Sequence, residues 1–201
     1  MTKISLIKGE LGYQDVVSRM KLRADEIASG ADEEVWLIQH SCVYTVGARA
    51  AAFDELCHNI YGVPVCKSDR GGLATYHGPG QRVCYAMINL RKRGLSVRDY
   101  IFLLEEWIIS ALKRKDISAN RNDVNIGAWV DRKKIASIGV HVSKGVSSHG
   151  FALNVCTEMS YFEKIIPCGI LGVEMTSIER EIGENIRVDY ADEEIINAIP
   201  F

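Results

Sequence analysis

Short apolar runs that follow one another without helices between them are the feature that most constrains the fold of this chain. Two such runs lie in residues 34–47, "EVWLIQHSCVYTVG", on either side of the polar pair His40-Ser41. Residues 63–69 and 82–90 supply two further runs, and the second, "RVCYAMINL", has the β-branched and aromatic content of a buried strand. Strands in adjacent runs predict a largely antiparallel sheet.

The C-terminal half adds strands of the same kind. Residues 127–142, "GAWVDRKKIASIGVHV", predict a β-hairpin that turns near Asp131 to Lys133. Residues 149–155, "HGFALNV", predict one more strand. The strands outnumber the helices, so we expect an α+β or mixed α/β fold.

Three helices are expected around this sheet. The first covers residues 13–30 and is closed by Gly30. The second begins after Ser96 and runs to about Lys115, because Ser96 followed by Asp99 has the spacing of a capping box. A short third helix is expected within residues 192–199.

Composition narrows the function. The 201 residues suit one domain over residues 1–201, and a formal charge of −2 argues against a basic nucleic-acid-binding surface. No apolar run approaches the ~20 residues that span a bilayer, and no signal-peptide segment follows Met1. We therefore expect a cytoplasmic protein that binds neither membrane nor nucleic acid. The six cysteines form no C-x-x-C pair and no zinc-site spacing, so no metal is expected.

The stretch "RGGLATYHGPGQ", residues 70–81, contains four glycines among aromatic and ionisable side chains. It matches neither the P-loop pattern nor G-x-G-x-x-G. A connecting loop with two turns is one interpretation. A loop that contacts a ligand fits better, because glycine lets the backbone approach a ligand closely and Arg70, Tyr76 and His77 place donors beside it.

Two adjacent lysines begin the second strand of the predicted hairpin. Strand alternation predicts that Lys134 shares a face with Ala136, Ile138, Val140 and Val142, whereas Lys133 lies on the other face. A lysine on an apolar face is unfavourable unless its ammonium meets a partner. The alternative is that both lysines are solvated at the end of the hairpin.

Cys168 lies between Pro167 and Gly169, which would present its thiol at a bend. A thiolate about 4 Å from an ammonium is attracted by roughly 4 kcal/mol at an effective dielectric of about 20. Such a partner would make Cys168 a nucleophile. A histidine is the commoner partner, and the sequence does not decide among its histidines, of which His77 and His149 lie next to glycines.

Together these segments resemble the lipoyl(octanoyl) transferases, which transfer octanoyl groups in lipoic acid synthesis. The motifs "RGGLATYHGPGQ", "KIASIGVHV", "HGFALNV" and "IPCGI" carry the resemblance, which extends from about residue 35 to about residue 175. It implies a mixed, largely antiparallel sheet flanked by helices, similar to the catalytic domains of lipoate and biotin protein ligases.

The resemblance also implies roles for individual residues. Cys168 matches the family's acyl-thioester nucleophile, and Lys134 matches the lysine that favours ionisation of this thiol. The positions that match its substrate-binding segments are Arg70, Gly71, Gly72, Leu73, Ala74, Thr75, Tyr76, His77, Ser137, Ile138, Gly139, Gly150, Phe151 and Ala152.

The implied activity is transfer of octanoyl from octanoyl-acyl carrier protein to a lysine of lipoyl domains, without a cofactor. The implied acceptors are the E2 subunits of 2-oxoacid dehydrogenases and the glycine cleavage H protein. An ATP-dependent lipoate-protein ligase and a lipoyl-domain amidotransferase on the same fold remain alternatives, as does an acyl-carrier-binding module without turnover.

Overall fold

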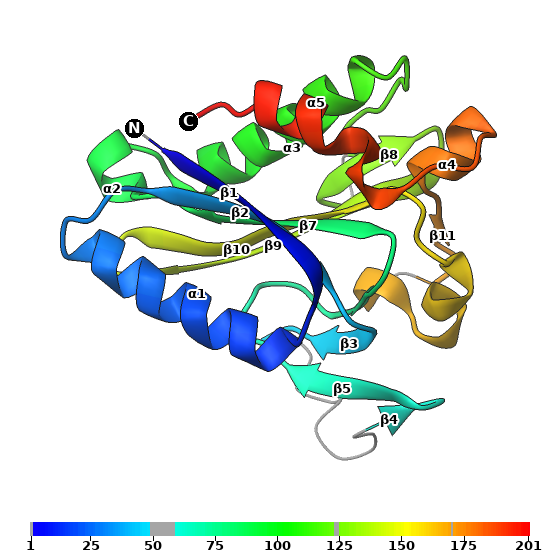
Figure 1. Cartoon of the computed structure of the whole chain (residues 1–201), viewed down its shortest axis with the longest axis horizontal. Helices are drawn as coiled ribbons and strands as arrows, with labels where there is room; N and C mark the ends of the chain where they lie inside the picture. The colour runs from blue at the N-terminus through cyan, green and yellow to red at the C-terminus, as the bar shows by residue number, and fades with distance from the viewer. Residues whose placement is uncertain (1, 49–58, 123–124, 170) are drawn as a thin grey trace.

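The computed structural model describes residues 2–48, 59–122, 125–169 and 171–201, and a mixed sheet forms the centre of this part of the chain (Figure 1). Its strands have the order β1-β2-β7-β10-β9-β11, and β8 also pairs with β9. The strands are β1 (Lys3–Leu11), β2 (Glu34–His40), β7 (Gln81–Met87), β8 (Gly127–Val130), β9 (Lys133–Ser143), β10 (Val146–Asn154) and β11 (Glu174–Met175).

Most neighbours in this sheet are antiparallel. The pairs β2–β7, β7–β10, β9–β10 and β8–β9 are antiparallel, whereas β1–β2 and β9–β11 are parallel. The expected mixed, largely antiparallel sheet is therefore confirmed.

A second, smaller sheet lies beside the first, near the N-terminal end of α1 (Tyr13–Ala28), where the Tyr13 hydroxyl donates to Ser68 Oγ (Figure 1). Its order is β4 (Asn59–Ile60), β5 (Val63–Lys67), β3 (Val43–Val46) and β6 (Ala74–His77). The two runs predicted in residues 34–47 thus enter different sheets, and the chain crosses between the sheets at Ser41 and Cys42. This crossing places the end of β6 next to the central strands.

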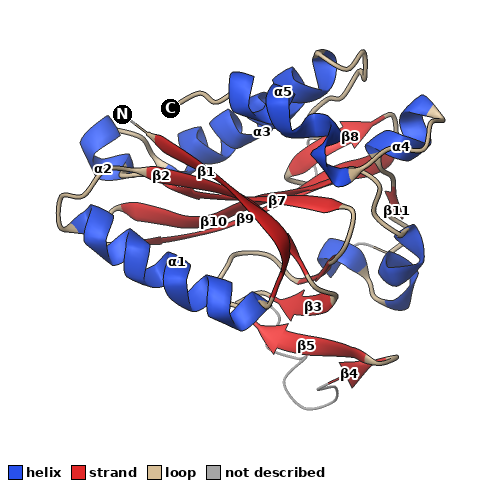
Figure 2. Ribbon diagram, in the orientation of Figure 1, coloured by secondary structure: helices blue, strands red, loops and turns tan. Residues whose placement is uncertain are grey.

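Helices cover both faces of the central sheet (Figure 2). They are α1 (Tyr13–Ala28), α2 (Leu90–Arg93), α3 (Val97–Lys113), α4 (Ile178–Ile182) and α5 (Asp192–Asn197), with 3₁₀ turns η2 (Met159–Lys164), η3 (Pro167–Gly169) and η4 (Val188–Ala191). On one face α1 packs through Val16, Met20 and Ile27. On the other face α3 and α5 pack together, and Trp107 Nε1 donates to the Ile195 carbonyl at 2.6 Å.

The helix signals in the sequence are confirmed at their N-terminal ends. Ser96 and Asp99 form both bonds of a capping box at the start of α3, although α3 ends at Lys113. The strand predicted over 82–90 ends at Met87, because Asn89 caps α2 and accepts from the Lys92 amide. None of the helices in the described ranges is long and apolar enough to cross a membrane.

Candidate active site

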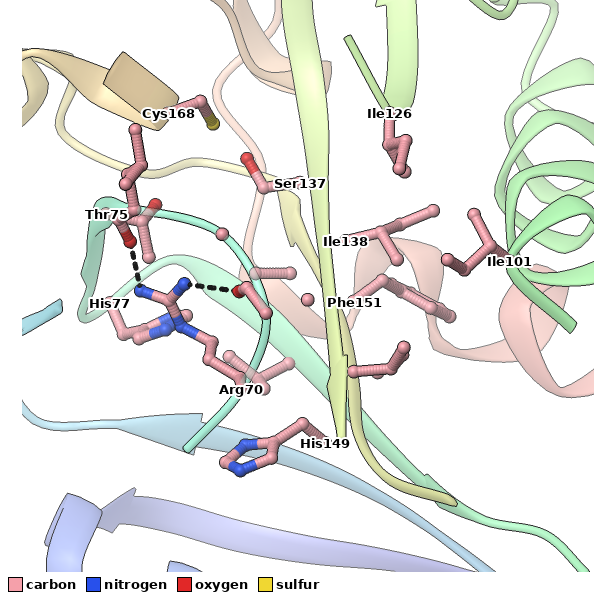
Figure 3. A pocket seen from close by; sticks show the side chains of 18 of the residues that line it. Arg70, Thr75, His77, Ile101, Ile126, Ser137, Ile138, His149, Phe151 and Cys168 are labelled. Atoms are coloured by element: carbon pink, nitrogen blue, oxygen red, sulfur yellow. Dashed lines mark hydrogen bonds between the residues drawn. The ribbon is translucent and has the colours of Figure 1, made fainter. Parts of the chain in front are cut away.

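A pocket of about 470 Å³ lies between residues 70–81, called the glycine-rich segment below, and strands β9 and β10 (Figure 3). It contains fifteen of the sixteen predicted site residues. These are Cys168, Lys134, Arg70, Gly71, Gly72, Leu73, Ala74, Thr75, His77, Ser137, Ile138, Gly139, Gly150, Phe151 and Ala152. Tyr76 is the exception: its ring is buried in a separate cluster with Tyr44 and Phe162.

The glycine-rich segment contacts β9 directly. The Gly71 N–H donates to the Val140 carbonyl at 2.9 Å. A Cβ on Gly139 would lie 3.0 Å from the Gly71 carbonyl oxygen and 3.1 Å from Arg70 Cδ. Glycine at position 139 therefore allows the segment to approach the strand.

Arg70 holds this segment together from inside. Only 7% of Arg70 is exposed, and its guanidinium donates to the Thr45 carbonyl at 2.8 Å and to Thr45 Oγ1 at 2.7 Å. It also donates to the carbonyls of Leu73 at 2.9 Å and Gly71 at 3.0 Å. Arg70 therefore shapes the loop through these bonds, and its role in binding a substrate stays a prediction.

The other polar side chains of the segment are also bonded within the protein. His77 Nδ1 bonds Gln81 Oε1 at 2.8 Å, and the Tyr76 hydroxyl donates to Cys42 Sγ at 3.2 Å. Burial lowers the pKa of His77 well below its ordinary value, so the ring is neutral. Of these two residues only His77 lines the pocket, as a neutral ring whose Nδ1 is already bonded.

Cys168 lies beside the buried amine of Lys134. Lys134 Nζ is 3.3 Å from Cys168 Sγ, and Lys134 is 1% exposed. Burial lowers the pKa of Lys134, while Cys168 is the largest influence that opposes this shift. In contrast, Lys133 Nζ pairs with Glu181 at 2.7 Å near the surface. Lys134, the lysine predicted from the sequence, is therefore the one that contacts Cys168.

The strand-alternation argument for this lysine is wrong, however. The β8–β9 register shifts so that Ala128 pairs with Ala136 whereas Trp129 pairs with Lys134. Ile135 and Ala136 consequently both enter the core under α3. Lys134 lies on the opposite face, beside Trp129 and next to Met175 of β11. One extra residue in β9 thus turns Lys134 towards Cys168.

A glycine makes room for the Lys134 side chain. Gly127 has φ +137°, and a Cβ there would lie 2.7 Å from Lys134 Cε and collide with the Ala136 carbonyl oxygen. The lysine stem therefore passes over the backbone of β8 where no side chain is present.

The backbone at Cys168 adopts an unusual conformation. Cys168 has φ 57° and ψ 12°, in the left-handed region that costs a non-glycine residue about 1–3 kcal/mol. The following Gly169 also has positive φ, and a Cβ there would collide with Leu73 Cδ1. The thiol is therefore held at a bend packed on the glycine-rich segment. The Gly169 N–H donates to the Ile166 carbonyl at 3.0 Å, so this amide is already occupied.

The histidines considered as partners of Cys168 bond elsewhere. His149 Nε2 bonds Asp69 Oδ1 at 2.9 Å, and His40 Nε2 bonds the Tyr85 hydroxyl at 2.8 Å. Among the described residues, the hydrogen bond to Cys168 Sγ comes from Lys134 and from no histidine. Nor do the described residues include three or more His, Cys, Asp or Glu side chains grouped to hold a metal.

The pocket extends around β9. Arg70, Ser137 and Cys168 lie on one side of the strand, whereas Ile138 and Phe151 lie on the other with Ile101 and Ile126 (Figure 3). Ile138 and Phe151 belong to the core cluster under α3. They therefore line the part of the pocket on the opposite side of β9 from Cys168.

Several lining residues were not predicted as site residues. Tyr13, Tyr85, Asn125 and Ile126 line the pocket. Tyr13 and Tyr85 come from α1 and β7, elements with no motif signal. Asn125 contacts Lys134, as described below, and only the fold brings the two together.

The protein combines a mixed sheet with a pocket in which Cys168, held at a bend of the backbone, contacts the buried Lys134. This combination defines an enzyme of the acyl-transfer class. The chain belongs to the family of the lipoyl protein ligase A/B catalytic domain, whose model matches residues 13–200.

Curated relatives specify the activity. The chain is 38% identical to the octanoyltransferase of Anaplasma phagocytophilum (strain HZ), over 92% of this chain and 90% of that protein. It is 46% identical to the octanoyltransferase of Maricaulis maris (strain MCS10), over 79% of this chain and 72% of that protein. The expectation of an octanoyltransferase that serves lipoate synthesis is confirmed.

Solved structures confirm the fold. A structure of the bipartite lipoate protein ligase and its E2 lipoyl domain from Thermoplasma acidophilum matches with a TM-score of 0.72. The match covers 98% of this chain and 81% of that chain at 16% identity. At this identity the likeness establishes the architecture alone.

Proposed function

We propose that this enzyme transfers octanoyl from octanoyl-acyl carrier protein to a lysine of lipoyl domains through a thioester on Cys168. The observation that carries the proposal is the 3.3 Å contact between Lys134 Nζ and Cys168 Sγ at the pocket wall. Membership of the octanoyltransferases supplies the acyl group. The acceptors would be E2 subunits of 2-oxoacid dehydrogenases and the glycine cleavage H protein.

The lysine would favour the thiolate by charge. At about 3.3 Å, an ammonium and a thiolate attract by roughly 5 kcal/mol at an effective dielectric of about 20. Burial of each ion costs several kcal/mol, so attraction alone does not make the pair favourable. Hydrogen bonds donated by the ammonium must supply the rest of the stabilisation. The Ile126 carbonyl accepts one of them from Lys134 Nζ at 2.8 Å.

In the first step, the Cys168 thiolate attacks the carbonyl of the carrier's thioester. The C–S bond to the phosphopantetheine arm breaks, and its sulfur leaves with the electron pair. The ammonium of Lys134 protonates this leaving thiolate, which yields an octanoyl-enzyme thioester, a free carrier thiol and a neutral Lys134 amine.

In the second step, the neutral acceptor amine attacks the octanoyl-Cys168 thioester. Lys134 accepts a proton from the attacking nitrogen while the C–S bond to Cys168 breaks. The products are an octanoyl amide and the restored ammonium–thiolate pair. Both steps balance without an added co-reactant.

The octanoyl chain would lie beside the glycine-rich segment. Leu73 and Ala74 line the pocket there, and the Arg70 guanidinium is bonded to Thr45 and to the Leu73 carbonyl. Burial of about six methylenes at ~0.8 kcal/mol each contributes roughly 5 kcal/mol, which favours octanoyl over acetyl.

An assay of purified enzyme and a lipoyl domain with three different octanoyl donors distinguishes this proposal from its alternatives. Octanoyl-acyl carrier protein alone should yield octanoylated lipoyl domain. Product only from octanoate plus ATP would indicate a ligase, and product only from another octanoylated lipoyl domain would indicate an amidotransferase. Binding of the carrier without product from any donor would indicate a module without turnover.

A further inference from the structure

Asn125 makes the shortest hydrogen bond to the amine of Lys134. Its Oδ1 lies 2.6 Å from Lys134 Nζ, compared with 2.8 Å for the Ile126 carbonyl and 3.3 Å for Cys168 Sγ. An ammonium has three N–H donors and these are three acceptors, so each proton has one partner.

The two carbonyl acceptors fix the direction of the third bond. An amide oxygen and a backbone carbonyl have no proton to give, so they take two N–H groups whether the nitrogen is charged or neutral. The remaining tetrahedral position then points at Cys168 Sγ in both states. It carries a proton in the ammonium and a lone pair in the amine.

We propose that Asn125 is a positioning residue that directs this third position of Lys134 onto the Cys168 sulfur and stabilises its ammonium. The inference rests on the proposed function of Cys168 and Lys134. It identifies the source of the hydrogen bonding that the buried ion pair requires.

The backbone of Asn125 is held by hydrogen bonds on both of its polar groups. The Asn125 N–H donates to Asn122 Oδ1 at 3.2 Å, and the Asn125 carbonyl accepts from Trp129 Nε1 at 3.1 Å. The amide oxygen must face Lys134, because the opposite orientation would set an NH₂ group against a donor-only ammonium. The backbone therefore presents an acceptor to Nζ.

The neutral amide suits this position better than a carboxylate. Glu105 of α3 is the carboxylate whose charge acts on Lys134, but Arg121 Nε pairs with it at 3.1 Å and the Gly127 N–H donates to it at 3.0 Å. Across the pocket, the positive charge of Arg70 interacts electrostatically with Cys168, and its guanidinium donates to the Thr45 carbonyl. Cys168 is thus the anionic partner left for the ammonium.

The test is the pH dependence of Cys168 alkylation by iodoacetamide, located by peptide mass spectrometry, in the full chain. Asn125→Ala removes one acceptor from the ammonium and should slow alkylation near neutral pH about tenfold or more. At high pH the rate should reach the wild-type plateau, because the thiol is then ionised without help.

Two further variants make the test specific. Asn125→Asp has the size of asparagine but competes with the thiolate for the ammonium, so it should also move the midpoint to higher pH. Asn120→Asp adds the same charge on an exposed side chain and should leave the profile unchanged. If Asn125→Ala does not fold, the comparison of Asn125→Asp with Asn120→Asp decides.

Profiles of both Asn125 variants that superimpose on wild type would overturn the inference. A lowered plateau without a midpoint shift would also overturn it, because Asn125 would then affect access alone. Failure of the proposed function is distinct: wild-type enzyme would acquire no octanoyl group on Cys168 from octanoyl-acyl carrier protein.

Discussion

The amine of Lys134 and the sulfur of Cys168 lie 3.3 Å apart although 34 residues separate them in the chain. Lys134 enters from β9 of the central sheet, and Cys168 belongs to η3, a 3₁₀ turn packed on the glycine-rich segment. The two residues meet at the wall of one pocket. Their contact therefore depends on how the smaller sheet and η3 are placed against β9.

Replacement of Lys134 should slow alkylation of Cys168. Lys134→Ala removes the positive partner of the thiolate, so we expect at least a tenfold lower alkylation rate near neutral pH and loss of octanoyl transfer. Lys133→Ala is the matched control, because Lys133 pairs with Glu181 instead. Equal alkylation profiles for the two variants would remove the role of Lys134.

The contact between the glycine-rich segment and β9 should be weakened by a side chain at position 139. Gly139→Ala places a Cβ 3.0 Å from the Gly71 carbonyl oxygen, so we expect it to lower the free energy of unfolding by about 1–3 kcal/mol. At Gly71 the nearest atom to a Cβ is the Val140 carbonyl oxygen at 3.4 Å, and Gly71→Ala should cost less. Urea unfolding measures both, and a larger loss for Gly71→Ala would contradict this account.

The stability of the protein should depend on the forked shape of the Arg70 guanidinium as well as on its charge. Arg70→Lys keeps the charge but loses the fork that reaches both Thr45 and Leu73, leaving buried carbonyls without donors. We expect a loss of about 2–4 kcal/mol in the free energy of unfolding. Arg98→Lys, on an exposed position of α3, should change it little. Equal stability of the two variants would show that the internal bonds of Arg70 do not matter.

Buried histidines should make the protein sensitive to acid. Burial lowers the pKa of His40 to about 4, and burial also lowers the pKa values of His77 and His149. The unfolded chain, with histidine near pKa 6.5, then binds more protons than the folded protein, so stability falls as the pH decreases from about 6.5 towards about 4. Each histidine contributes a slope of up to about 1.4 kcal/mol per pH unit.

The contribution of one histidine is measurable. His40→Gln removes the titrating group from its site between the Leu11 carbonyl and the Tyr85 hydroxyl. The variant should lose less of its free energy of unfolding than wild type over the same pH interval, as measured by urea unfolding. An unchanged slope would show that His40 does not titrate on unfolding as expected.

The sequence predicted those structural features that are formed by residues close together in the chain. The capping box of Ser96 and Asp99 and the hairpin turn near Asp131 are short-range interactions, and both occur as expected. Strand β1 went unpredicted, because Lys3–Leu11 owes its place to parallel pairing with β2, which no local motif encodes.

The site was predictable as a set of motifs, and its geometry was not. The motifs indicated Cys168, Lys134 and the glycine-rich segment. The register shift at Ile135, which turns Lys134 away from Ala136, arises from pairing with β8. The contact of Asn125 with Lys134 requires the folded loop as well. Such tertiary relationships are absent from strand periodicity.

The most direct test of the covalent intermediate is intact mass spectrometry of wild-type and Cys168→Ala protein incubated with octanoyl-acyl carrier protein. The account predicts one octanoyl group on wild type, located on Cys168 and discharged when a lipoyl domain is added, and none on the variant. Undiminished octanoylation of the lipoyl domain by the Cys168→Ala protein would contradict it.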